Sequence, residues 1–354
     1  MFSTPVSTPA RKLRVFKYQA LGNSYLIVDP RYCADPNALF DKSSDGDMRP
    51  GARLVQGLCD QSYGIGSNGL LFGPVGVAQT SVFRLRIINS DGTPAGFSGN
   101  GVRIFAQYLR DAGYARAGDH FSVEILEERA TAAPIRNIAP VRLLDTPDQR
   151  IEVDGPYAPR FGSMAIAANP THVREAHRAG LAGNLSYTVT PLAEAGAKLT
   201  GLDSAWSSST LLDIGNPHCV TFVEKHRMPG TAEMAACNEA LRAIAFRPAV
   251  ADRTGAVFAN GANLQWAYAP DRAHLELAIY ERGEGPTMAS GSSASAAACA
   301  AFARGLIDSA VDVVMPGGTL AVRIQGSPDN ITAVTLSGYA TRILDGVVDL
   351  DIFV

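Results

Sequence analysis

The chain has little cysteine and no paired cysteine motif. Only five of its 354 residues are cysteines, and no two of them stand at C-x-x-C spacing. Because the count is odd and the chain is long, neither a disulfide framework nor a structural zinc site is expected. The sequence therefore predicts a protein of a reducing compartment, which we take to be the cytoplasm.

Long apolar runs and blocks of one charge are also missing. No stretch approaches the 18 uninterrupted apolar residues of a transmembrane helix, and residues 1–12 lack the apolar segment of a signal peptide. With 31 basic and 34 acidic residues the net charge is −3, and no basic block offers a footprint for nucleic acid. We therefore expect no membrane and no nucleic-acid partner, and the composition leaves a homodimer open.

What is present is the composition of a folded protein, long enough for two domains, with 46% hydrophobic and 18% charged residues. Alternating segments predict strands at residues 13–18, 25–30, 83–88, 121–125, 220–223, 275–280 and 311–315, and the end of the chain from 319 is mostly strand and turn. Residues 101–110 carry an apolar stripe that predicts a helix with one buried face. Residues 292–304 are small enough to pack on every side, which predicts a central helix. Many strands with few helices indicate the α+β class.

Two segments of weak periodicity suggest how the chain is divided. Residues 127–155 are rich in Pro, Asp and Arg and mark a candidate domain boundary. Residues 193–209 are mostly small and polar and are interpreted as a surface insertion. We expect an N-terminal domain of residues 13–154 completed by a returning strand at 340–354, and a second domain of residues 155–339.

A weak internal repeat precedes the two predicted helices. Ser98-Gly99-Asn100 stands before the first and Ser290-Gly291-Ser292 before the second, 192 positions apart (290 − 98). The first backbone N–H groups of a helix are unpaired and carry partial positive charge. Two such helix starts facing each other would hold a carboxylate from both sides.

A glycine-rich segment, Gly64-Ile65-Gly66-Ser67-Asn68-Gly69, matches G-x-G-x-x-G. The match is weak because residues 70–72 read as a strand, whereas a dinucleotide fingerprint opens a helix. We do not predict a dinucleotide site here.

Several motifs taken together resemble the diaminopimelate epimerase family, from about Val15 to Leu350. They are Gly22-Asn23, Gly64-Ile65-Gly66, Asn89-x-Asp91-Gly92, Gly215-Asn216-Pro217-His218, Glu281-Arg282-Gly283 and Pro316-Gly317-Gly318. The resemblance implies two similar α+β domains, each a sheet wrapped around a central helix, with the ligand cleft between them. It also implies cofactor-independent inversion at an α-carbon, without pyridoxal phosphate or metal.

The family uses two cysteines for proton transfer, and the matching positions here are Ser98 and Ser290. A hydroxyl is a much weaker acid than a thiol, so these serines need a base beside them. His218 and Glu281 are the nearby groups able to take a proton, which makes these four residues the predicted catalytic set. We favour His218 as the base because its unperturbed pKa is about 6.5.

The resemblance also implies a substrate-binding set. Glu281 would meet the reacting α-ammonium, and the far amino-carboxylate would be held by Asn89, Asn216, Asn263 and Arg282, with a further contact from Asn23. The reacting carboxylate would be held by the backbone N–H groups of Gly99, Asn100, Gly291 and Ser292.

Each assignment has a plainer structural alternative. The serines are favoured N-cap residues, His218 could fix a turn in the core, and Glu281 and Arg282 could form an ion pair. The asparagines could serve turns.

The favoured function is a cofactor-independent isomerase or epimerase acting on an amino acid, with serine in place of the cysteine pair. One alternative is an isomerase of the phenazine-pathway type, which shares the fold and moves a proton with a carboxylate. A second is a catalytically silent amino-acid-binding protein. A third is a true epimerase with engineered serines, although Pro286 and Ser293 favour natural divergence.

Overall fold

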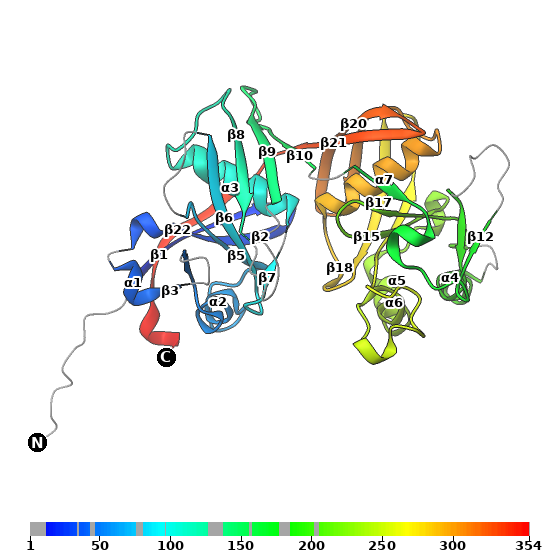
Figure 1. Cartoon of the computed structure of the whole chain (residues 1–354), viewed down its shortest axis with the longest axis horizontal. Coiled ribbons are helices and arrows are strands. Elements are labelled where there is room, and N and C mark those ends of the chain that lie inside the picture. Colours follow the sequence, from blue (N-terminus) through cyan, green and yellow to red (C-terminus); the bar gives the residue numbers. More distant parts are fainter. Residues whose placement is uncertain are drawn as a thin grey trace, which may run out of the picture. The chain divides into compact units, whose positions relative to one another are not determined.

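A computed structural model describes residues 12–33, 35–42, 47–75, 81–95, 97–126, 137–155, 158–176, 185–201 and 205–353. The chain forms two compact units, Met1–Val153 with Tyr339–Val354, and Asp154–Gly338. Helices and strands of both units are labelled in Figure 1.

The strands of the first unit come from residues before 155, except for one strand near the end of the chain. Its strands are β1 (Lys12–Ala20), β2 (Asn23–Val28), β3 (Asp41–Lys42), β4 (Met48–Arg49), β5 (Gly69–Phe72), β6 (Val82–Asn89), β7 (Pro94–Ala95), β8 (His120–Ile125), β9 (Asn137–Leu143), β10 (Ile151–Asp154) and β22 (Thr341–Asp349). Its helices are α1 (Pro36–Leu39), α2 (Ala52–Cys59) and α3 (Gly99–Asp111).

The second unit follows a similar plan. Its strands are β11 (Arg160–Phe161), β12 (Val173–Glu175), β13 (Tyr187–Val189), β14 (Ser209–Asp213), β15 (Pro217–Phe222), β16 (Asn263–Tyr268), β17 (His274–Glu281), β18 (Gly285–Pro286), β19 (Ala310–Met315), β20 (Gly318–Ser327) and β21 (Asn330–Gly338). Its helices are α4 (Thr190–Thr200), α5 (Thr231–Ala236), α6 (Asn238–Ala245) and α7 (Gly291–Ala303).

The strand pairings show that the weak sequence repeat is a repeat of topology. In the first unit β1 pairs antiparallel with β2, β2 parallel with β5, β5 antiparallel with β6, β6 parallel with β8, and β8 antiparallel with β9. In the second unit β14, β15, β16, β17, β19 and β20 pair in the same sequence of directions. Helices α3 and α7 occupy the same place, in the parallel crossover after the fourth strand of this series. The α+β prediction is confirmed.

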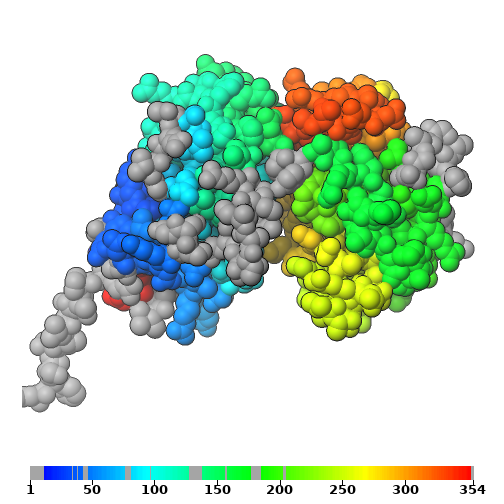
Figure 2. All heavy atoms as spheres, in the orientation of Figure 1, coloured from blue at the N-terminus to red at the C-terminus, as the bar shows by residue number. Residues whose placement is uncertain are grey.

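Helix α7 is central because its side chains are small. It consists mainly of alanine and serine, is buried along almost its whole length, and packs against β14 to β17 and β19 to β21. Figure 1 shows α7 beneath β20 and β21, whose red-orange atoms form an outer surface of this unit in Figure 2. Small side chains allow strands to approach the helix from several sides, which supports the predicted central position.

Helix α3 differs from the expectation of one buried face. Every residue from Gly99 to Leu109 is buried, including Arg103 and Gln107. The helix contacts β1, β2, β9 and β22, so the sheet covers its polar positions as well as its apolar stripe. The sequence pattern identified the stripe, but it did not show that the other face is also enclosed.

The surface insertion predicted at residues 193–209 is wrong in its described part. Residues 193–200 belong to α4, and Trp206 is buried against Trp266 at 4.9 Å between ring centroids. A Cβ added to Gly196 would lie 2.7 Å from Trp206 Cδ2, so the small residues of α4 make room for this indole. Small residues here mark close packing, whereas their polarity in the sequence indicates a surface segment.

Part of the predicted boundary segment lies outside the described residues, namely 127–136. The rest contains the strands β9 and β10, which pair with each other, and β9 also pairs with β8. Among the described residues, no helix is long and apolar enough to cross a membrane.

The five cysteines are all free, and Cys219 and Cys299 are buried in the second unit as packing residues.

Candidate active site

The topology of the second unit brings three predicted site positions to one edge of its sheet. Strands β15 and β16 are parallel, and their starts are paired with His218 opposite Asn263. Strand β17 runs antiparallel to β16, so it ends beside the start of β16. The Oδ1 atom of Asn263 accepts a hydrogen bond of 3.0 Å from the backbone N–H of Arg282. Strand direction therefore brings together residues that are far apart in the sequence.

Ser290 is the N-cap of α7 at this edge. Its backbone is extended, and its Oγ accepts hydrogen bonds from the backbone N–H of Ser293, at 3.3 Å. Ser290 Oγ also lies 3.3 Å from the hydroxyl of Ser292. The N-cap role is therefore present, and the O–H of Ser290 is still able to donate to an acceptor.

The acceptor is Glu281, at the end of β17. Burial raises the pKa of the Glu281 carboxyl group, the hydrogen bond from Ser290 lowers it, and the nearby charge of Glu284 raises it. The Thr287 hydroxyl, acting on the carboxyl group as a hydrogen-bond donor, also lowers the pKa of Glu281. The net pKa is raised, which moves a carboxylate towards the range of a proton carrier near neutrality.

Arg282 does not form an ion pair with Glu281. None of the salt bridges among the described residues involves either side chain, and Arg282 Nη1 donates to the backbone carbonyl of Asn260 at 3.1 Å. Burial and the neighbouring charge of Arg247 lower the pKa of Arg282. A half-buried guanidinium with few partners is suited to an anionic ligand.

His218 is enclosed, and this changes the role that we assign to it. Its exposed fraction is 0%, its Nε2 lies 2.8 Å from Asn216 Oδ1, and its Nδ1 lies 2.9 Å from Gln265 Nε2. Burial and the charge of Arg282 lower the pKa of His218 to about 3. A ring with both nitrogens occupied and such a low pKa does not accept a proton near neutrality. The structure therefore disfavours His218 as the base.

The two predicted asparagines of this unit present their amide nitrogens. Asn216 uses its Oδ1 towards His218, and Asn263 uses its Oδ1 towards Arg282 N. With the oxygens engaged, the NH₂ groups are the parts left for a ligand, and they can only donate hydrogen bonds. This arrangement suits an acceptor such as a carboxylate.

The first unit contains the matching helix start. Ser98 is the N-cap of α3, and its Oγ accepts from Gly101 N at 3.0 Å and from the Tyr25 hydroxyl at 3.3 Å. Asn100 is buried, and its Oδ1 accepts from Nη2 of Arg103 at 2.5 Å. The Nε and Nη1 atoms of Arg103 are buried without hydrogen-bond partners, and burial lowers its pKa to about 10.

Asn89 and Asn23 lie at the corresponding strand ends of the first unit. Asn89 opens a turn in which its Nδ2 donates to Thr93 Oγ1 at 3.0 Å and its backbone N–H to the Thr93 carbonyl at 2.8 Å. Asn23 begins β2, and its Oδ1 is buried without a hydrogen-bond partner. Asn89 therefore has the turn role that the sequence left open, whereas Asn23 has an unsatisfied acceptor.

The glycine-rich segment has a structural role. Gly69 begins β5 and no helix follows, which agrees with the weak reading of the motif. Asn68 exchanges hydrogen bonds with Ser24 of β2, and Ser67 Oγ donates to the Ser24 carbonyl. The loop therefore joins β2 to β5.

Several residues that surround the site were not found from the sequence. Gln265 and Ser293 contact the His218 network, Thr287 acts on Glu281, and Tyr25 and Arg103 lie at the start of α3. For Gln265 a signal existed, because Asn263 and Gln265 alternate as polar residues in an otherwise apolar strand.

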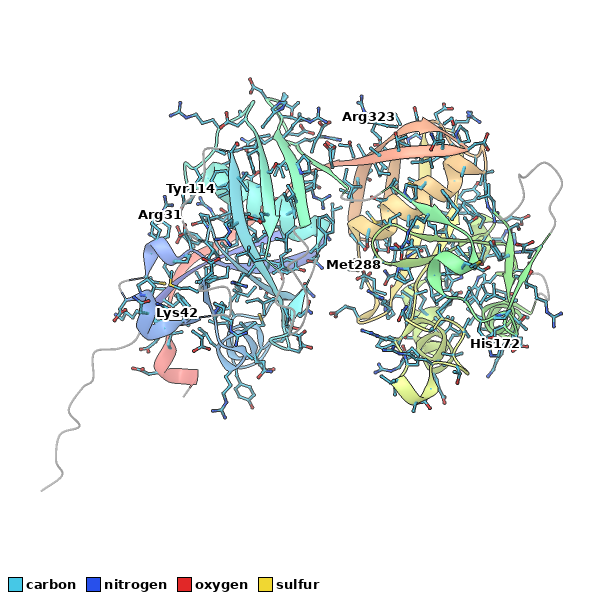
Figure 3. All side chains as sticks on the ribbon, in the orientation of Figure 1. Arg31, Lys42, Tyr114, His172, Met288 and Arg323 are labelled. Atoms are coloured by element: carbon cyan, nitrogen blue, oxygen red, sulfur yellow. The ribbon has the colours of Figure 1, made fainter. Side chains whose placement is uncertain are left out.

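Met288, two residues before Ser290, is exposed and marked in Figure 3. In the described part of the chain, no group of His, Cys, Asp or Glu has the arrangement of a metal site.

Solved structures of other proteins share the fold of this chain. A phenazine biosynthesis protein of the PhzF family from Bacillus anthracis superposes with a TM-score of 0.57 at 14% identity, over 95% of this chain and 99% of that one. A hydroxyproline epimerase from Agrobacterium vitis superposes with a TM-score of 0.55 at 11% identity, over 96% and 93%. At these identities the likeness establishes the fold alone.

Sequence relatives carry the name of the family that the motifs resemble. The sequence model of the family described as diaminopimelate epimerase matches residues 210–342. Diaminopimelate epimerase 2 of a Nostoc species is 28% identical over 96% of this chain and 97% of its own length. The diaminopimelate epimerase of a Cyanothece species is 29% identical over 95% and 99%. The resemblance is confirmed: the chain is related to the diaminopimelate epimerase family along almost its whole length. The named relatives and the family model also confirm the prediction of an isomerase-type enzyme.

Proposed function

We propose that the chain is a cofactor-independent isomerase that moves a proton at the carbon next to the carboxylate of an amino-acid substrate. The observation that supports it is the pairing of Glu281 with Ser290 at the N-terminus of α7. Glu281 has a raised pKa, accepts a hydrogen bond from Ser290 and has no ion-pair partner in the described residues. A carboxylate in this state can replace the missing thiol as the group that carries the proton.

In this proposal the substrate C–H bond breaks and its proton passes to a Glu281 oxygen, directly or through the Ser290 hydroxyl. The electron pair stays on the substrate and is delocalised into the adjacent carboxylate. The backbone N–H groups of Gly291 and Ser292 would stabilise this negative charge, since the first N–H groups of a helix lack partners within it. The helix start at Ser98, with Gly99 and Asn100, is assigned the same role for the first unit.

The far end of the substrate is assigned to Arg282 with Asn216 and Asn263. These groups can donate several hydrogen bonds, and the guanidinium adds charge, so a second carboxylate or amino-carboxylate is the expected partner. The proposed substrate class is therefore an amino acid with a second polar end.

The test is exchange of a substrate hydrogen with solvent. The protein is incubated in D₂O with diamino and dicarboxylic amino acids, and deuterium incorporation is measured by mass spectrometry. Deuterium at one carbon of a bound amino acid is the expected result. Tight binding without exchange would instead favour the silent amino-acid-binding protein, with both serines serving only as helix caps.

Carboxylate-based proton transfer is also the chemistry of the phenazine-type alternative. Because the low pKa of His218 leaves the Glu281 carboxylate as the proposed base, this alternative is favoured more strongly than it is by the sequence alone. The two readings differ in the product, because epimerisation inverts one carbon whereas the phenazine-type reaction moves a double bond. A chiral separation and a proton spectrum of the exchanged product would distinguish them.

The pH dependence of exchange should respond to Glu284. The base form of Glu281 exists above its pKa, and the charge of Glu284 raises that pKa. In Glu284→Gln the pKa of Glu281 should fall, so the acid limb of the pH–rate profile should move to lower pH. An unchanged acid limb would show that Glu281 is not the group that titrates.

Arg282→Ala should weaken binding of a substrate with a distal carboxylate by about 2–5 kcal/mol, the cost of removing one partner of a buried charged pair. Isothermal titration calorimetry measures the change in affinity. The matched control is Arg323→Ala, an exposed arginine of β20 marked in Figure 3, which should bind like the wild type. Equal affinities of the two variants would remove Arg282 from the site.

A further inference from the structure

A buried chain of hydrogen bonds connects the start of β15 with the first turn of α7. It runs from Asn216 to His218 at 2.8 Å, from His218 to Gln265 at 2.9 Å, and from Gln265 to Ser293 at 3.0 Å. His218, Gln265 and Ser293 are fully buried. This series of hydrogen bonds lies wholly within the second unit. Gln265, which joins His218 to Ser293, belongs to neither the motifs nor the proposed binding set.

The orientation of the Gln265 amide follows from what it contacts. Its Nε2 has two hydrogens and two acceptors, His218 Nδ1 and Ser293 Oγ, while its Oε1 is buried without a partner. In the reversed orientation the oxygen would face these groups and two N–H donors would be left unpaired. One unpaired acceptor costs less than two unpaired donors, so the observed orientation is preferred.

This orientation determines where the proton of His218 lies. An amide N–H can only donate, so Nδ1 of the ring must accept and the proton must reside on Nε2. The Nε2–H then donates to Asn216 Oδ1. Asn216 then uses its Oδ1 for the ring, which leaves its NH₂ group to donate to a ligand.

We propose that Gln265 fixes the tautomer of His218, keeping the ring a neutral hydrogen-bond donor that positions Asn216 for the ligand. His218 is then a positioning residue and not the proton acceptor. The proposal goes beyond the assignment of Glu281 as the base, because it concerns the protonation of one ring. A measurement that needs no substrate can test it.

The direct test is nuclear magnetic resonance of the full chain with ¹⁵N-labelled histidine, assigned by comparison with His218→Gln. The wild type should show one neutral ring with its proton on Nε2 and no titration between pH 5 and 8, because the pKa of His218 lies near 3. A proton on Nδ1, or titration within this range, would overturn the proposal whatever the activity of the protein.

Gln265→Glu provides the second test. A carboxylate can only accept, so the neutral ring should carry its proton on Nδ1. The opposite charge should also raise the pKa of His218 by about 1–3 units. The matched control is Gln325→Glu, the same change at an exposed position of β20, which should leave the His218 signals unchanged. An Nε2 proton that persists in Gln265→Glu would contradict the proposal, and if this variant does not fold, the wild-type spectrum still decides.

Discussion

Replacement of Glu281 by glutamine is expected to lower the rate of substrate deuterium exchange by about 10²- to 10⁴-fold, the usual contribution of a positioned general base. Glutamine has nearly the same shape as glutamate but cannot accept the proton. Because Ser290 can donate to either side chain, the N-cap of α7 should be retained in this variant. Affinity for the ligand should therefore change less than the exchange rate.

Two comparisons make this result specific. Glu194→Gln changes an exposed carboxylate in α4 of the same unit and should exchange at the wild-type rate. Glu281→Asp keeps a carboxylate but shortens the side chain by one methylene, so its rate should lie between those of the wild type and Glu281→Gln. If exchange survived in Glu281→Gln and disappeared in His218→Ala, the base would be His218 after all.

The second large effect is expected on stability. Trp206→Ala should lower the free energy of unfolding of the second unit by about 3–5 kcal/mol, as for other buried tryptophans. Trp206 packs against Trp266, fills the space beside Gly196, and donates from Nε1 to the Arg227 carbonyl at 3.1 Å. Its removal leaves a cavity and takes this hydrogen bond from the Arg227 carbonyl.

Fluorescence-detected unfolding in denaturant measures this change. The chain has two tryptophans, and both lie in the second unit, so the remaining Trp266 reports on the unit that carries the substitution. Tyr63→Ala removes an aromatic side chain that is 86% exposed and should change stability by less than about 0.5 kcal/mol. A loss below about 1 kcal/mol in Trp206→Ala would mean that residues 193–209 are peripheral, as the sequence had suggested.

Much of the fold could be predicted because hydrophobic periodicity is a local property. The predicted strands at residues 83–88, 121–125 and 275–280 correspond to β6, β8 and β17, and both principal helices begin within two residues of their predicted starts. Errors arose where small or polar residues are enclosed by distant segments. Arg103 is polar in the sequence but buried in α3, and Gly196 is small because Trp206 lies beside it.

The candidate site shows the same difference between what local sequence patterns predict and what distant segments determine. Sequence motifs identified Ser290, Glu281 and Asn263, but not their hydrogen-bond partners. The pairing of Asn263 with the backbone of Arg282 depends on the antiparallel register of β16 and β17. The raised pKa of Glu281 depends on its burial, which no short motif specifies.

The sequence by itself determined the two helix starts, the serine at each of them, and the family to which the motifs point. A serine followed by glycine before a helix is a local signal, and the absence of cysteine at both positions is visible in the letters alone. Only the tertiary structure decided what surrounds His218. Its ring is held by Gln265, a residue 47 positions later that lies beside it because β15 and β16 are parallel neighbours. The same histidine exposed to water would accept a proton near neutrality. In the arrangement that we propose, burial and the amide of Gln265 at Nδ1 keep it a neutral donor instead.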